Sequence, residues 1–96
     1  MSVNVIALAT INPDEKESAR IYSEQAKSVV NAYGGKASGR YSTLYKFTGC
    51  EAPQVTLVME FQNAESAKSC FESPEYQNLL AIRDKGFLDM KIYLAE

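Results

Sequence analysis

The stretch "VTLVMEFQN", residues 55–63, decides the fold, because it combines the clearest strand pattern in the chain with the start of a helix. Large apolar side chains occupy every second position, namely Val55, Leu57, Met59 and Phe61. This period of two predicts a strand with one face toward a core. Asn63 follows directly and predicts a helix start, because an Asn side chain caps free backbone amides.

The segment after Asn63 predicts two helical pieces and a last strand. Ser73 has the side chain of a helix cap, and Pro74 is typical of a first helical position. We therefore expect a break near residue 73 and an end to the helical region at Gly86. A final strand is predicted by alternating apolar residues: Leu88, Met90, Ile92 and Leu94.

The first half of the chain predicts a strand, a helix and a second strand. Residues 3–10 are rich in β-branched and apolar residues on both faces, which is typical of a covered strand. Asn12 as cap and Pro13 at the first position predict a helix that ends at the glycine pair 34–35. A strand from Lys36 to Phe47 is predicted by the alternation of Tyr41, Thr43, Tyr45 and Phe47.

The expected order β-α-β-β-α-β is the ferredoxin-like α+β fold, a four-stranded antiparallel sheet with both helices on one face. We expect one domain over residues 1–96. Its open face would carry Thr56, Val58 and Glu60 and would need cover. A second copy would provide that cover as a barrel-like homodimer, and a small molecule would lie in the cavity between the two sheets.

Composition excludes several classes of function. The net charge is −2 and the basic residues are scattered, so no nucleic-acid partner is expected. The apolar stretch at residues 5–11 is too short for a membrane span or a signal peptide, and we expect a cytoplasmic protein without a membrane partner. Histidine is absent, and the two cysteines fit no metal motif, so neither a metal nor a cofactor is expected.

Tyr76 and Arg83 are the first candidates for a binding site. They are seven residues apart, which is nearly two helical turns, and would share a helix face roughly 10 Å apart. Arg83 would present its fork of donors to a carboxylate, either of a ligand or of a protein group. The alternative is that Arg83 only meets the negative end of its helix before Gly86, with its stem over apolar neighbours.

Glu60 and Arg40 are the other candidates. Glu60 interrupts a strand with apolar neighbours, where a carboxylate needs a partner or a raised pKa. It would act as a general base if it is desolvated, or it would form a structural ion pair with Arg40 or Arg83. Arg40 lies on the strand face opposite Tyr41, and is either a surface charge or a residue that attracts anions into a cavity.

Three motifs together carry a family resemblance: "AYGGK" at 32–36 with Arg40 beyond it, "VMEF" at 58–61, and "SPEYQNLLAIR" at 73–83. In this order they resemble the bacterial domain-of-unknown-function family thirteen-thirty, of the dimeric α+β barrel superfamily. The resemblance spans almost the whole chain and implies a ferredoxin-like fold that pairs through its sheets. Its recurrent residues correspond here to Gly34, Gly35, Arg40, Glu60, Phe61, Ser73, Pro74, Tyr76 and Arg83.

The resemblance implies positions without roles, because the family has no established activity. Related families resemble cofactor-free monooxygenases and isomerases, so two classes of function are open. In the first, Arg40 and Arg83 hold an anionic substrate while Glu60 or Tyr76 moves a proton. In the second, the protein is a non-catalytic metabolite-binding or structural dimer with Glu60 neutralised by an arginine. A cavity lined by Glu60, Tyr76 and Arg83 would favour the enzyme.

Overall fold

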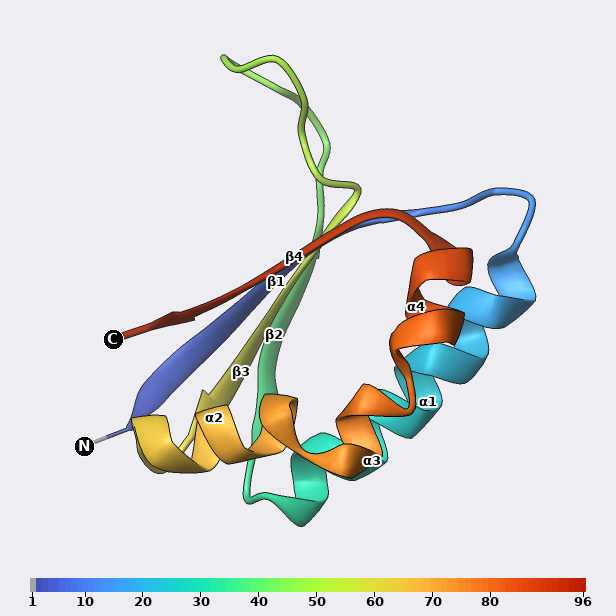
Figure 1. Cartoon of the computed structure of the whole chain (residues 1–96). Coiled ribbons are helices and arrows are strands. Elements are labelled where there is room, and N and C mark those ends of the chain that lie inside the picture. Colours follow the sequence, from blue (N-terminus) through green and yellow to red (C-terminus); the bar gives the residue numbers. More distant parts are fainter. Residues whose placement is uncertain (1) are drawn as a thin grey trace.

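The computed structural model describes residues 2–96 and has the predicted order of elements. The elements are β1 (Val3–Ile11), α1 (Lys16–Ala32), β2 (Lys36–Ser42), β3 (Val55–Phe61), α2 (Ala64–Glu72), α3 (Pro74–Gln77), α4 (Leu80–Gly86) and β4 (Phe87–Ala95). The strands form one sheet in the order β2-β3-β1-β4, and each neighbouring pair is antiparallel. All helices cover the same face of this sheet (Figure 1). The ferredoxin-like α+β fold is therefore confirmed.

The core lies between the sheet and the helices, as the alternation in residues 55–61 predicts. Met59 and Phe61 are buried, with Phe61 only 1% exposed, and Leu57 packs against the same cluster. The intervening residues of β3 point to the open face, and there Glu60 is half-buried. Gly35 explains how closely the end of α1 approaches β3, since a Cβ there would lie 2.5 Å from Cζ of Phe61.

The two predicted caps in the second half of the chain are confirmed. The Asn63 side chain accepts a hydrogen bond from the amide of Ser66 at 2.8 Å. Ser73 Oγ accepts one from the amide of Tyr76 at 3.1 Å and donates to the carbonyl of Cys70 at 2.7 Å. The helical region therefore breaks at Ser73, as predicted. It breaks a second time after α3, where the chain turns at residues 78–79 before α4.

The predicted start of the first helix is wrong by a few residues. Helix α1 begins at Lys16, whereas Asn12 lies in the preceding turn. Its side-chain oxygen accepts from the amide of Asp14 at 3.0 Å, and its backbone amide donates to the carbonyl of Gly86 at 2.9 Å. Asn side chains stabilise such local turns as readily as helix starts, which explains the difference.

The predicted end of the second strand is also wrong. Strand β2 stops at Ser42, and residues 43–54, here called the arm, project from the body of the protein (Figure 1). Ser42 pairs with Val55, the first residue of β3, so no partner strand continues beside Tyr45 and Phe47. Both of these side chains are exposed, although their alternation is typical of a strand.

Candidate functional site

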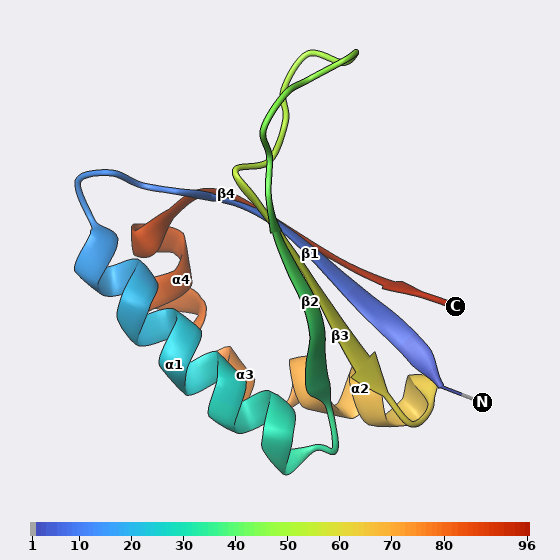
Figure 2. The ribbon, with the colours of Figure 1, turned by 180° about the vertical axis from the view of Figure 1, so that it is seen from behind.

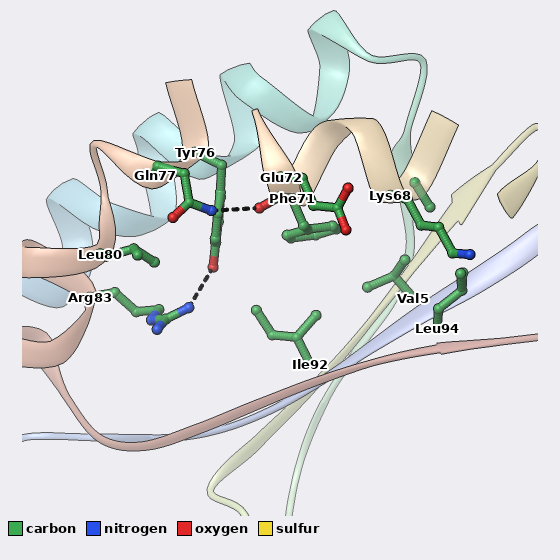
Figure 3. A pocket seen from close by; sticks show the side chains of 11 residues that line it. Val5, Lys68, Phe71, Glu72, Tyr76, Gln77, Leu80, Arg83, Ile92 and Leu94 are labelled. Atoms are coloured by element: carbon green, nitrogen blue, oxygen red, sulfur yellow. Dashed lines mark hydrogen bonds between the residues drawn. The ribbon is translucent and has the colours of Figure 1, made fainter. Parts of the chain in front are cut away.

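Tyr76 and Arg83 meet at the boundary between α3, α4 and the sheet. Tyr76 is 2% exposed, and Arg83 donates a hydrogen bond from Nη1 to the Tyr76 hydroxyl at 3.2 Å (Figure 3). They lie on two separate helices rather than on one helix face, because the chain turns at residues 78–79. That turn brings the Arg83 guanidinium to within 6.0 Å of the Tyr76 ring centre.

Tyr22 of α1 completes this polar cluster. Its hydroxyl lies 2.7 Å from that of Tyr76, and Tyr22 is 6% exposed. Burial, together with the neighbouring Tyr76, raises the pKa of Tyr22 well above its usual range. Burial is the largest single influence on the pKa of Arg83 and lowers it, but the hydrogen bond with Tyr76 and the charge interactions with Tyr76, Asp84 and Tyr22 together outweigh burial and raise the pKa. At neutral pH the cluster therefore combines a neutral Tyr22 with a cationic Arg83.

A pocket of about 410 Å³ opens beside this cluster, between helices α2–α4 and strands β1 and β4 (Figure 3). Its walls are mostly apolar, with Val5, Ala67, Phe71, Leu80, Ile92 and Leu94 among the lining residues. Arg83 and Tyr76 lie at one end, and Lys68 and Glu72 lie toward the other (Figure 3). The pocket thus has one half-buried cation, an apolar middle and a polar rim.

Glu60 does not line this pocket. It lies on the open face of β3, opposite Asn4 on β1 and Lys36 on β2 in the strand register. Within residues 2–96, Glu60 forms no ion pair with Arg40 or Arg83. Among residues 2–96, neither of the ion pairs considered for Glu60 is therefore formed, and the pocket of the single chain lacks Glu60. A role for Glu60 in a cavity between two paired sheets stays a prediction. The alternation of side chains along β3 keeps Glu60 on the sheet face away from the helices.

Arg40 also lies away from Tyr76 and Arg83. Its strand position pairs with Leu57, so it is on the helix side of the edge strand β2. There it borders a second hollow with Lys16 and Arg20 of α1. The two arginines expected to hold one substrate therefore belong to different hollows of the chain.

No group of three or more His, Cys, Asp or Glu side chains within residues 2–96 is arranged to hold a metal ion. Cys70 is buried, Cys50 is exposed, and both are free thiols. None of the described helices is long and apolar enough to cross a bilayer.

Residues 4–96 match the family described as Domain of unknown function (DUF1330). The chain belongs to the DUF1330 family. No curated protein is similar enough in sequence to count as a relative.

Several solved structures share the fold of this DUF1330 chain. A protein of unknown function from Rhodopseudomonas palustris has a TM-score of 0.81 and 16% identity, over 97% of this chain and 79% of its own. A dabb-family protein with a ferredoxin-like fold from Mesorhizobium loti has a TM-score of 0.71 and 10% identity, over 99% and 95%. A protein from Nitrosomonas europaea, provisionally named an antibiotic biosynthesis monooxygenase, has a TM-score of 0.69 and 11% identity, over 97% and 86%. At these identities the likeness shows the fold alone.

Three residues of the DUF1330 site were missed by the sequence reasoning. Tyr22 fits the core face of α1 by its spacing, and nothing in the sequence links it to Tyr76, which is 54 residues away. Lys68 and Glu72 are exposed residues of α2, and from the sequence they would be predicted as ordinary surface charges. A signal was available only for Lys68 and Glu72, because their four-residue spacing puts them on one side of a helix.

Proposed function

We propose that this DUF1330 protein binds a small organic anion in the pocket between its helices and its sheet, with Arg83 as the anchor. The observation that carries the proposal is the incomplete pairing of Arg83. Its side chain is 25% exposed, and its Nη1 donates to a hydroxyl, that of Tyr76, rather than to a carboxylate. Its Nε has only a long contact of 3.5 Å with the Asp84 carboxylate, which is 74% exposed. A partly desolvated guanidinium with free donors favours a bound carboxylate, which accepts two parallel hydrogen bonds.

The other walls of the pocket indicate the rest of the ligand. A volume of about 410 Å³ is in the usual range for small-molecule sites, and apolar walls suit an aliphatic or aromatic body. Lys68 and Glu72 at the far end would accept a second polar group. We therefore expect a small carboxylate with an apolar body and one polar substituent.

We infer that the protein is a homodimer that pairs through its open sheet face. Ile6, Leu8 and Val58 are half-buried there, and Tyr93 is 52% exposed. An apolar sheet face without helices is stabilised by a second layer, and a second copy is the simplest one. In such a dimer each chain keeps its own proposed binding pocket between the helices and the sheet, and the ligand does not lie between the two sheets.

An enzyme that uses Tyr76 to move a proton is the second candidate. The observation in its favour is that the Tyr76 hydroxyl lies between the Tyr22 hydroxyl at 2.7 Å and the Arg83 guanidinium at 3.2 Å. Both contacts orient the Tyr76 hydroxyl for a proton transfer. The chemistry would be cofactor-free, but it would have no help from Glu60, which lies on the other face of the sheet.

The binding proposal is tested by a thermal-shift screen of small carboxylates at millimolar concentration, followed by calorimetric titration. Arg83→Met keeps the stem over its apolar neighbours but removes the charge, and it should abolish the stabilisation by any hit. Arg40→Met is the matched control, because Arg40 borders a different hollow, and it should bind like the wild type. A hit that binds Arg83→Met with unchanged affinity would refute Arg83 as the anchor.

A further inference from the structure

The arm, residues 43–54, carries the most exposed large apolar side chains of the described chain. Leu44 is 97% exposed, Phe47 91% and Tyr45 73%. None of the three belongs to, or packs against, either of the two hydrophobic clusters of the core. A single exposed apolar side chain is ordinary, but three within four residues mark a surface that contacts something.

The arm has a defined conformation at its base and near its tip. At the base, the amide of Thr43 donates to the carbonyl of Gln54 at 3.1 Å, and the Gln54 side chain accepts from the amide of Ile11 at 3.0 Å. Near the tip, Lys46 donates to the carbonyl of Cys50 at 3.0 Å. A preformed loop loses little conformational freedom when it docks, so the arm is suited to binding.

The exposed side chains of the arm form a small surface of their own. The rings of Tyr45 and Phe47 pack edge to face with centres 5.1 Å apart. Gly49 makes the turn beyond them, with a φ of +103° that favours glycine. The aromatic pair is thus held together without belonging to either core cluster, and tyrosine is enriched at protein interfaces.

The arm lies where a molecule on the open sheet face would meet it. It leaves the ends of β2 and β3 and projects away from the helical layer, as both views of the ribbon show (Figures 1 and 2). Tyr41 pairs with Thr56, which places it on the open face next to the arm, and it is 61% exposed. The exposed ring of Tyr41 therefore adjoins the exposed side chains of the arm on the side of the open sheet face.

We propose that the arm clasps a second copy of this chain, packing Leu44, Tyr45 and Phe47 against the partner subunit that covers the open sheet face. This inference rests on the proposed homodimer and adds the element that secures it. A stable interface buries about 800 Å² on each partner. The aromatic pair alone would supply on the order of 300 Å² of this area. Twofold symmetry would use both arms in the same way, so each contact counts twice.

The charges on the arm favour a protein partner over a membrane surface. Lys46 and Glu51 are its only charged residues, and they cancel. A loop that inserts into a bilayer normally adds basic residues that attract anionic lipids. The whole chain has a net charge of −2, which opposes such attraction. A second copy, with its own open apolar face, is therefore the occupant to which the proposal commits.

The arm carries its own attachment point for a cross-linking test. Cys50 is exposed and Cys70 is buried, so a benzophenone maleimide will label Cys50 selectively in the folded protein. Irradiation at a concentration where the protein is dimeric should give covalent dimers, with the adduct on the strands of the partner subunit. The control is Cys50→Ser combined with Glu24→Cys, which moves the label to an exposed position on α1. We expect this control to give no covalent dimer.

A second variant measures what the arm contributes to association. Replacing Leu44, Tyr45 and Phe47 together by Ser leaves the core untouched, so the circular dichroism spectrum should not change. Sedimentation analysis should show a dimer dissociation constant raised at least roughly a hundredfold, from the apolar area removed. Lys46→Ser combined with Thr48→Ser is the matched control on the same arm, and should leave the constant within about threefold.

The outcomes separate the two proposals. A wild-type dimer that is unaffected by the triple replacement, or that gives no cross-link from Cys50, would overturn the arm contact and leave the sheet-face dimer standing. A wild-type protein that stays monomeric at high concentration would overturn both. If the wild-type protein binds anionic vesicles through the arm, and the triple replacement leaves the dimer dissociation constant unchanged, the arm is a membrane-binding element and the proposed contact with the partner subunit is overturned.

Discussion

The contact between the hydroxyls of Tyr22 and Tyr76 leads to a quantitative prediction about stability. Tyr76→Phe removes the oxygen that lies 2.7 Å from the Tyr22 hydroxyl and 3.2 Å from Arg83. The ring remains, so its edge-to-face packing on Phe71 at 5.0 Å is kept. Water cannot easily replace the lost partner, because Tyr22 is 6% exposed and Tyr76 2%. The substitution therefore leaves the buried Tyr22 hydroxyl without a partner and also removes the hydrogen bond of Arg83.

The structure gives the size of this effect. Loss of the partner of a buried polar group costs about 1–3 kcal/mol, so we expect Tyr76→Phe to lower the free energy of unfolding by about 2 kcal/mol. In a domain of this size such a loss lowers Tm by roughly 8–16 °C. Tyr22→Phe should cost only about 1 kcal/mol, because Arg83 still donates to Tyr76. The double variant should lose about 2 kcal/mol rather than 3, since its two hydroxyls disappear together.

The free energy of unfolding is measured by urea titration followed by circular dichroism, for the wild type, the two single variants and the double variant. All are kept at one protein concentration, because association would shift the unfolding midpoint. Tyr33→Phe is the control, since the Tyr33 hydroxyl donates to Glu75 at 3.2 Å on the exposed surface. It should change stability by no more than about 0.5 kcal/mol. If the effects of Tyr22→Phe and Tyr76→Phe add to within about 0.3 kcal/mol, the two hydroxyls are not coupled and the reasoning fails.

Three further predictions concern the supports of the site. Ser73→Ala removes the cap that starts α3 and should lower the free energy of unfolding by about 1 kcal/mol in urea titration. Gly86→Ala would place a Cβ 2.6 Å from the backbone nitrogen of Ala19, so it should lower the free energy of unfolding by more than about 2 kcal/mol in the same urea titration. Unchanged stability would mean that α4 can shift away from α1. Burial raises the pKa of Cys70 to about 11, so at pH 8 a thiol reagent should modify Cys50 quickly and Cys70 only after unfolding. The raised pKa of Cys70 contributes stability that is complete below pH 9.0, its pKa in the unfolded chain, and that is lost as the pH rises through about 11. In this pH range Cys70→Ala should therefore reduce the fall in the free energy of unfolding by about 1.4 kcal/mol per pH unit.

The parts of the fold that could be predicted from sequence depend on local chemistry. Ser73 and Pro74 restrict the backbone at their own positions, so the helix break follows without knowledge of the rest of the chain. The alternation in residues 55–61 predicts which side of β3 is buried, because side chains on a strand alternate whatever its neighbours are. Both predictions are confirmed by direct contacts.

The parts that could not be predicted depend on pairing between distant segments. Tyr45 and Phe47 alternate as a strand does, but a strand forms only where a neighbour supplies hydrogen bonds, and β3 begins at Val55. From the sequence alone, Arg40 and Glu60 could be assigned to a common cavity, because the sequence does not give the register of β2 on β3. That register puts Arg40 beside Leu57 on the helix side, while Glu60 faces the other way.

The separation of Glu60 from Tyr76 and Arg83 favours the binding class of function proposed above. Among the described residues, Glu72 is the only carboxylate that lines the pocket, and it lies toward the far end from Arg83 (Figure 3). Proton transfer would then depend on the Tyr76 hydroxyl, which accepts a hydrogen bond from Arg83. An anionic ligand held by Arg83 would occupy the same guanidinium that donates to the Tyr76 hydroxyl. Anion binding and base catalysis by Tyr76 therefore compete for one guanidinium, and its free donors favour binding.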